Sequence, residues 1–141
     1  MNTLKKVFIF LSLLLIIGCG KKENNLKCEI SNNLDYGSST QTVEFYGEDK
    51  ISKMIVTESF VIDDSFSDFY DALFDSVFNS YNTDVNGIKV ESKKDGLSFK
   101  VIMTVNINEL DSDMLENSYY DFSKSLSEFK EEFINDGYTC N

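Results

Sequence analysis

Residues 97–108 alternate between apolar and polar side chains more regularly than any other part of the chain. The apolar members of this segment are Leu97, Phe99, Val101, Met103, Val105 and Ile107. Side chains of a β-strand point alternately to its two faces, so the pattern predicts a strand with one face in water and the other in a core. A sheet built around such a strand needs helices over its apolar face only.

Two further segments have the spacing of helices that cover such a face. Residues 64–81 carry apolar side chains at intervals of three and four, namely Phe66, Phe69, Tyr70, Leu73, Phe74, Val77, Phe78 and Tyr81. The second segment carries Leu115, Tyr119, Phe122, Leu126, Phe129 and Phe133, with Gly137 as the expected stop. Four serines between residues 118 and 127 favour a break in this helix near residues 118–120.

Four other short segments have strand patterns, at residues 27–30, 42–46, 54–62 and 88–90. In the third, apolar residues alternate from Met54 to Ile62 except at Glu58. Short turns between these segments favour antiparallel pairing. We therefore predict an α+β fold, with an antiparallel sheet of about five strands and two amphipathic helices packed on one face. Residues 27–141 form its single domain.

The first nineteen residues predict where the protein resides. Lys5 and Lys6 precede an apolar run from Val7 to Ile17, which is too short for a stable membrane span and is typical of a signal peptide. The sequence from Leu15 to Cys19 resembles the lipobox of bacterial lipoproteins. That resemblance implies cleavage after residue 18 and diacylation of Cys19, with the domain outside the cytoplasmic membrane. In the alternative, Cys19 is incidental in an uncleaved anchor.

Residues 19–26 then form a lipidated Cys followed by a short polar tether. Removal of residues 1–18 leaves 123 residues and lowers the net charge from -11 to -13. Such a charge argues against nucleic acid or anionic lipid head groups as partners, because both need a basic surface. The chain also lacks His, which excludes Ser-His-Asp and Cys-His catalysis.

If Cys19 carries lipid, the mature domain keeps two cysteines, Cys28 and Cys140. An exported chain meets an oxidising compartment, so the pair predicts a disulfide that joins the first strand to the end of the chain. The alternatives are two free thiols or a redox pair, although a redox pair usually has Cys-x-x-Cys spacing.

Acidic residues form two groups that we consider as cation sites. Asp64, Asp68, Asp71 and Asp75 share one face of the first helix, and Asp111 and Asp113 lie before the second. Oxygen ligands suit Ca²⁺ and Mg²⁺, but the spacing does not supply a closed ligand set, so we interpret the stripe as a solvated face. Helix capping by Asp111 or Asp113 accounts for part of the second group. We therefore assign no metal site.

Carboxylates also leave open a minimal hydrolase, since glycoside hydrolysis needs two of them. A sugar site usually needs aromatic platforms as well. The tyrosines that we expect to be available for such contacts are Tyr36, Tyr46, Tyr119 and Tyr120. No motif for a serine nucleophile or a phosphate loop is present.

Several short segments resemble small bacterial lipoproteins of the YehR-like family. They are the lipobox, Lys27–Ile30, Val43–Ile51 and the closing Glu131–Cys140. The family has no established activity, so the resemblance implies the fold and the cellular location and adds no catalytic residue.

The leading hypothesis is a non-enzymatic binding or interaction domain, anchored to the membrane through lipid on Cys19 and requiring no cofactor. Its ligand is a protein or a small molecule that the sequence does not identify. The alternatives are a calcium- or cation-responsive module and the carboxylate-based hydrolase.

Overall fold

The computed structural model describes residues 24–141, so the expected signal peptide, Cys19 and residues 20–23 of the expected tether lie outside the described residues. The strands are β1 (Asn24–Leu34), β2 (Gly37–Gly47), β3 (Ile51–Ile62), β4 (Ile88–Asp95), β5 (Ser98–Asn106) and β6 (Thr139–Cys140). The α-helices are α2 (Tyr70–Tyr81), α3 (Ser112–Glu116) and α4 (Leu126–Asn135), and the 3-10 helices are η1 (Asp64–Phe69) and η2 (Ile107–Glu109). The predicted α+β class is confirmed.

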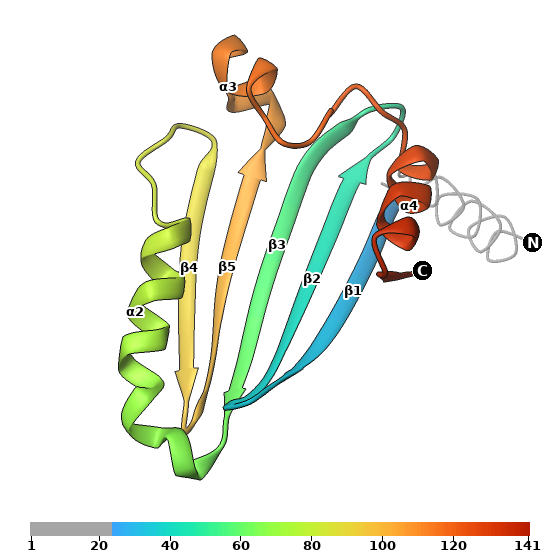
Figure 1. The fold of residues 1–141 in the computed structure, drawn as a ribbon. Helices are drawn as coiled ribbons and strands as arrows, with labels where there is room; N and C mark the ends of the chain where they lie inside the picture. Colours follow the sequence, from blue (N-terminus) through green and yellow to red (C-terminus); the bar gives the residue numbers. More distant parts are fainter. Residues whose placement is uncertain (1–23) are drawn as a thin grey trace, which may run out of the picture.

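All six strands belong to one antiparallel sheet in the order β4-β5-β3-β2-β1-β6 (Figure 1). The prediction of about five strands was therefore one strand too low. The additional strand, β6, pairs only with Cys28 and Glu29 of β1. Two residues carry too little pattern to be recognised as a strand from sequence, because alternation needs at least four.

The first strand begins earlier than the predicted domain boundary at residue 27. Residues 24–26 pair with the end of β2, from Phe45 to Gly47, so the expected tether does not extend to residue 26. Leu26 is only 4 % exposed and belongs to the core. Burial of this side chain explains why the strand extends back beyond Lys27.

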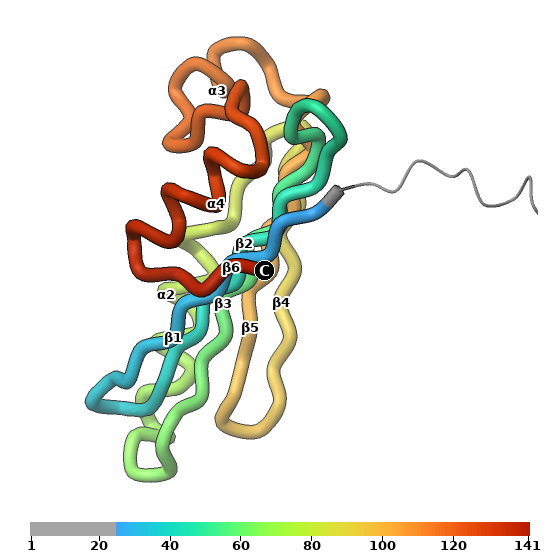
Figure 2. The backbone as a smooth tube through the Cα atoms, turned by 90° about the vertical axis from the view of Figure 1, so that its right-hand side faces the viewer, coloured from blue at the N-terminus to red at the C-terminus, as the bar shows by residue number. Residues whose placement is uncertain are grey.

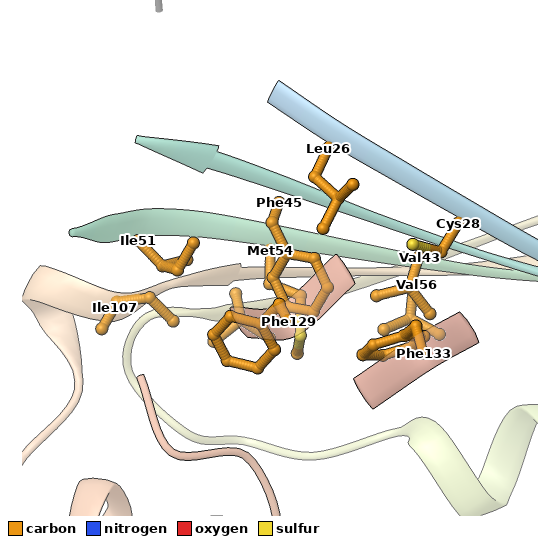
Figure 3. Packing of buried hydrophobic residues seen from close by; sticks show 11 residues of the cluster. Leu26, Cys28, Val43, Phe45, Ile51, Met54, Val56, Ile107, Phe129 and Phe133 are labelled. Carbon is orange, nitrogen blue, oxygen red and sulfur yellow. The ribbon is translucent and has the colours of Figure 1, made fainter. Parts of the chain in front are cut away.

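Helix α4 covers one half of the inner face of the sheet, over β1 and β2 (Figure 1). Its two buried aromatic residues, Phe129 and Phe133, pack on Phe45 with ring centroids 4.5 and 5.4 Å apart. Figure 3 shows these rings beside Leu26, Val43 and other apolar side chains of the same cluster. Aromatic contacts of this kind stabilise a small core beyond their buried area alone.

Helix α2 covers the other half, over β4 and β5, on the same side of the sheet as α4 (Figure 2). Tyr70 and Phe74 contact the ring of Phe99 edge-on, with centroids 5.6 and 5.3 Å away. The expected helix over residues 64–81 is α-helical only from Tyr70; residues 64–69 form η1, in which Phe66 has non-helical dihedral angles of φ -114° and ψ 17°. Among residues 24–141, no helix is both long and apolar enough to cross a membrane.

The expected second helix is divided into α3 and α4, separated by residues 117–125. This separation contains the break predicted near residues 118–120. Within it, Ser118 accepts a hydrogen bond from the backbone of Tyr120 at 3.1 Å, and Asp121 accepts one from Ser123. Such local bonds compete with helical hydrogen bonding and keep this segment irregular.

Candidate functional site

A disulfide between Cys28 and Cys140 joins the two ends of the described domain. The two Cα atoms are 4.1 Å apart, and the residues lie opposite each other in the β1–β6 pair. Next to them, Lys27 and Asn141 exchange backbone hydrogen bonds of 3.4 and 3.0 Å. The predicted pairing is therefore present in the structure, and it holds the segment after α4 against the first strand.

Both ends of α4 are defined by local chemistry. At the start, the Ser125 hydroxyl accepts from the Glu128 amide at 3.4 Å, while the Glu128 carboxylate accepts from the Ser125 amide at 2.7 Å. This reciprocal pair is a capping box. At the end, Gly137 adopts φ 93°, which a residue without Cβ tolerates, and the chain reverses. Tyr138 is thereby placed against Phe133, with ring centroids 4.8 Å apart.

A cleft of about 520 Å³ lies between α4 and the irregular segment before it, and we name it the α4 cleft. Its lining residues are Tyr119, Tyr120, Asp121, Lys124, Glu132, Phe133, Asn135, Asp136 and Tyr138. Three of them carry carboxylates and only Lys124 carries an ammonium group, which is ion-paired with Glu132. The volume falls in the range of small-ligand sites, and the excess of carboxylates beside tyrosine rings suits a positively charged ligand.

Tyrosines of the α4 cleft differ in their surroundings. Tyr119 is 92 % exposed, whereas Tyr120 stacks on Phe133 at 6.0 Å and contacts Phe45 edge-on at 6.1 Å. Burial raises the pKa of Tyr120 to about 12, and burial also raises the pKa of Tyr138. Both hydroxyls therefore stay neutral over the physiological pH range and act as hydrogen-bond partners rather than as bases.

A second hollow, of about 290 Å³, adjoins the α4 cleft at Asp136 and Tyr138. We name it the Glu58 hollow. It is lined by Ile30, Asn32, Ser39, Thr40, Gln41, Glu58, Asp136 and Tyr138. The lining includes two carboxylates and no lysine. The two cavities together form a negatively charged region on the helix-covered side of the sheet.

Glu58 lies at the centre of a hydrogen-bond network on this face. Its carboxylate accepts a bond of 2.6 Å from the Gln41 side-chain nitrogen, and the Tyr138 hydroxyl donates to the Gln41 side-chain oxygen. Burial, together with the charge and hydrogen bond of Glu58, raises the pKa of Tyr81. The network therefore links β2, β3, α2 and the segment after α4.

Our sequence candidates for a cation site lie elsewhere. Asp64, Asp68, Asp71, Asp75, Asp111 and Asp113 are all exposed. Asp71 is paired with Lys94 at 3.2 Å, and Asp111 caps α3 by accepting from the Met114 amide at 2.8 Å. Within residues 24–141, no group of three or more acidic, His or Cys side chains is arranged to hold a metal ion.

Sequence reasoning did not select the residues that line the two cavities, apart from Tyr119 and Tyr120. Of the other two expected tyrosines, Tyr36 contacts Phe69 edge-on, and Tyr46 donates to Glu44 on the open face of the sheet. Glu58 was recognisable from the sequence as unusual, because it is the one charged residue among the inward positions of β3. A carboxylate in an apolar register indicates a polar partner across the sheet.

Comparisons with known proteins support the fold alone. No family model matches the chain, and no curated protein matches it. An NMR structure of a protein from Streptococcus pneumoniae TIGR4 is similar, with a TM-score of 0.57 and 16% sequence identity. The match covers 86% of this chain and 88% of that chain. The same arrangement of sheet and helices therefore occurs in a protein of very different sequence.

Proposed function

We propose that the chain is a membrane-anchored lipoprotein whose domain binds a positively charged ligand in the α4 cleft, outside the cytoplasmic membrane. The lipid is carried by Cys19. The observation that carries the binding proposal is the α4 cleft itself, with its three carboxylates, single paired lysine and tyrosine rings. The disulfide supports the location, because such bonds persist in oxidising compartments.

The pKa shifts favour binding over acid–base catalysis. A general acid or base works best with a pKa near the operating pH. Hydrogen bonds from Ser123 lower the pKa of Asp121, and burial raises the pKa values of Tyr120 and Tyr138. The pKa of each group therefore moves further from pH 7. At that pH Asp121 serves as a fixed negative charge, and the two tyrosines serve as uncharged hydrogen-bonding groups.

Detergent partitioning tests the location. Two acyl chains give stable membrane binding, so the chain expressed in a bacterial host should enter the detergent phase, and Cys19→Ala should remain in the aqueous phase. The matched control is the Cys28→Ser, Cys140→Ser double variant, which should partition as the unaltered chain does. Equal partitioning of Cys19→Ala and the unaltered chain would disprove lipidation at this residue.

A tryptophan reporter tests the binding. The chain contains no tryptophan, so Tyr119→Trp introduces a single indole beside the α4 cleft, and Tyr36→Trp introduces one beside Phe69. We expect tetralysine to shift the emission of the Tyr119→Trp variant saturably, and tetraglutamate at the same ionic strength to leave it unchanged. The Tyr36→Trp variant should respond to neither peptide. If both variants respond equally to tetralysine, the attraction is a general effect of net charge.

A further inference from the structure

One edge of the sheet is only partly covered. Strand β6 pairs with Cys28 and Glu29, and among the described residues none pairs with β1 on this side from Ile30 to Leu34. Figure 2 shows the lower part of β1 running past β6 toward the hairpin with β2. An exposed strand edge offers unpaired backbone groups to another extended chain.

The direction of these backbone groups follows from the β6 contacts. Lys27 exchanges hydrogen bonds with Asn141, so its N–H and C=O point away from β2. Alternate residues of a strand point their backbone groups to the same side, which places those of Ser31 and Asn33 at the uncovered edge. An antiparallel strand would therefore make up to four backbone hydrogen bonds with these two residues.

The two edges of the sheet differ in charge. Strand β4, at the opposite edge, has the sequence IKVESKKD, in which most residues are charged. Charged side chains of this kind protect an edge from pairing with other chains. In β1 the uncovered residues, Ile30–Leu34, are ISNNL and carry no charge. This part of the edge lacks the protection that the other edge has.

The Glu58 hollow lies directly beside the uncovered edge, since Ile30 and Asn32 are part of its lining. A residue opposite Asn32 in an added strand would point its side chain to the same face as Asn32, toward the hollow. Strands are about 4.8 Å apart, so a lysine there reaches Asp136 more easily than Glu58, which lies three strand spacings away on β3. Both carboxylates favour a positive charge in this position.

We propose that the uncovered edge of β1 binds an extended basic segment of a partner protein as an added antiparallel strand, with a Lys or Arg side chain directed into the Glu58 hollow. The proposal goes beyond the proposed function, because it adds a second binding surface, the uncovered edge with the Glu58 hollow, beside the α4 cleft. Backbone hydrogen bonds supply affinity in this mode of recognition, and the side-chain pocket supplies specificity. Two features support the choice of partner: the uncharged edge and the lysine-free hollow beside it.

The probe is a short peptide, acetyl-Val-Thr-Lys-Thr-amide, whose residues would lie opposite Leu34, Asn33, Asn32 and Ser31 in that order. The measurement is amide hydrogen exchange by NMR on the full chain in detergent. We expect the peptide to slow exchange at Ser31 and Asn33 about tenfold when nine tenths of the chain is bound. The same peptide with Glu in place of Lys, or with both Thr amides N-methylated, should slow it little.

Variants of the hollow test the charge contribution. Asp136→Asn should weaken binding of the lysine peptide severalfold. Asp84→Asn, which changes an exposed residue outside both cavities, should leave that binding unchanged. Equal binding of the N-methylated peptide, or no change at Ser31 and Asn33 with any peptide, would overturn the proposal. Protection of these amides from exchange without peptide would overturn it as well. Protection that rises with protein concentration would assign the edge to a second copy, and protection independent of concentration would assign it to the chain itself.

The proposed function is tested separately, by detergent partitioning of Cys19→Ala and by the tetralysine response of Tyr119→Trp.

Discussion

Two glycines with positive φ differ in how much space surrounds them. A Cβ at Gly37, where φ is 147°, would lie 2.0 Å from the carbonyl oxygen of Val61, whereas a Cβ at Gly96, where φ is 58°, meets no atom within 4 Å. We predict that Gly96→Ala lowers the free energy of unfolding by about 1–2 kcal/mol through backbone strain alone. Gly37→Ala should cost more than about 3 kcal/mol, because strain and collision combine. Urea denaturation measures both, and equal losses would contradict the steric account.

Tyr120 makes the domain less stable at alkaline pH. Burial raises its pKa from 10.0 to about 12. Because the folded-state pKa is the higher one, the stabilising contribution is complete below pH 10 and is lost as pH rises from 10 through about 12. Tyr120→Phe should therefore reduce the loss of stability in this window. Thermal melts from pH 8 to pH 12 measure it, with Tyr36→Phe as the control that should retain the full loss.

The capping box makes the start of α4 sensitive to one hydroxyl. Ser125 provides the side-chain acceptor for the Glu128 amide, and we predict that Ser125→Ala lowers the free energy of unfolding by about 1 kcal/mol. Ser127→Ala, two residues further on, removes a hydroxyl that contacts the Ser125 hydroxyl at 3.2 Å but does not cap the helix, and it should change the free energy of unfolding by less than about 0.5 kcal/mol. Chemical denaturation compares the two. A larger loss for Ser127→Ala would show that the cap is not what fixes this end of the helix.

Helices and long strands were predictable because each repeats its own pattern several times. Residues 70–81 and the alternating segment that became β5 have enough repeats to identify both type and buried face, whereas Phe66 and Phe69, which we expected in the same stripe, lie in η1 and are exposed. The serines at 118–127 also predicted the break before α4. Strand β6 has only two residues, and its pairing with Cys28 comes from a contact distant in sequence. Local periodicity contains no information about such contacts.

The two cavities were less predictable for the same reason. Glu58 interrupted the apolar register of β3, which marked it as unusual. Its partners Gln41 and Tyr81 come from β2 and α2, and Tyr138 follows α4. Only the folded sheet brings these elements together. The tyrosines at 119 and 120 were recognised as candidate contacts, although Tyr120 contributes to the core as well as to the α4 cleft.

The disulfide spans most of the domain, with a sequence separation of 112. Chain-entropy reasoning assigns about 4–5 kcal/mol to a loop of this length. Reduction should therefore lower the melting temperature by more than ten degrees, since about 1 kcal/mol corresponds to several degrees in a domain of this size. The Cys28→Ser, Cys140→Ser double variant should melt at the temperature of the reduced chain. A reductant effect that persists in that variant would have to arise elsewhere.

The exposed acidic residues should give the domain little response to calcium. Asp64, Asp68 and Asp75 are solvated, and Asp71 already has Lys94 as a partner. We expect millimolar Ca²⁺ to shift the melting temperature by less than about one degree beyond NaCl of matched ionic strength. A true binding site, with Ca²⁺ present at 100 times its Kd, would stabilise the folded domain by about 2.7 kcal/mol, which corresponds to several degrees in melting temperature. A shift of that size would favour the cation-responsive alternative.

The Cys28–Cys140 bond also determines what a protease can release. It closes a covalent ring that contains almost all of the described domain, and the irregular segment 117–125 lies within that ring. One cut in this segment opens the ring without separating its two parts, because the sulfur bridge still joins them. If Cys19 carries the lipid, both pieces stay attached to the membrane through residues 19–28. Release of the whole domain then requires cleavage of the short stretch before Cys28. A second cut within the ring, or reduction after the first cut, would release only part of the domain.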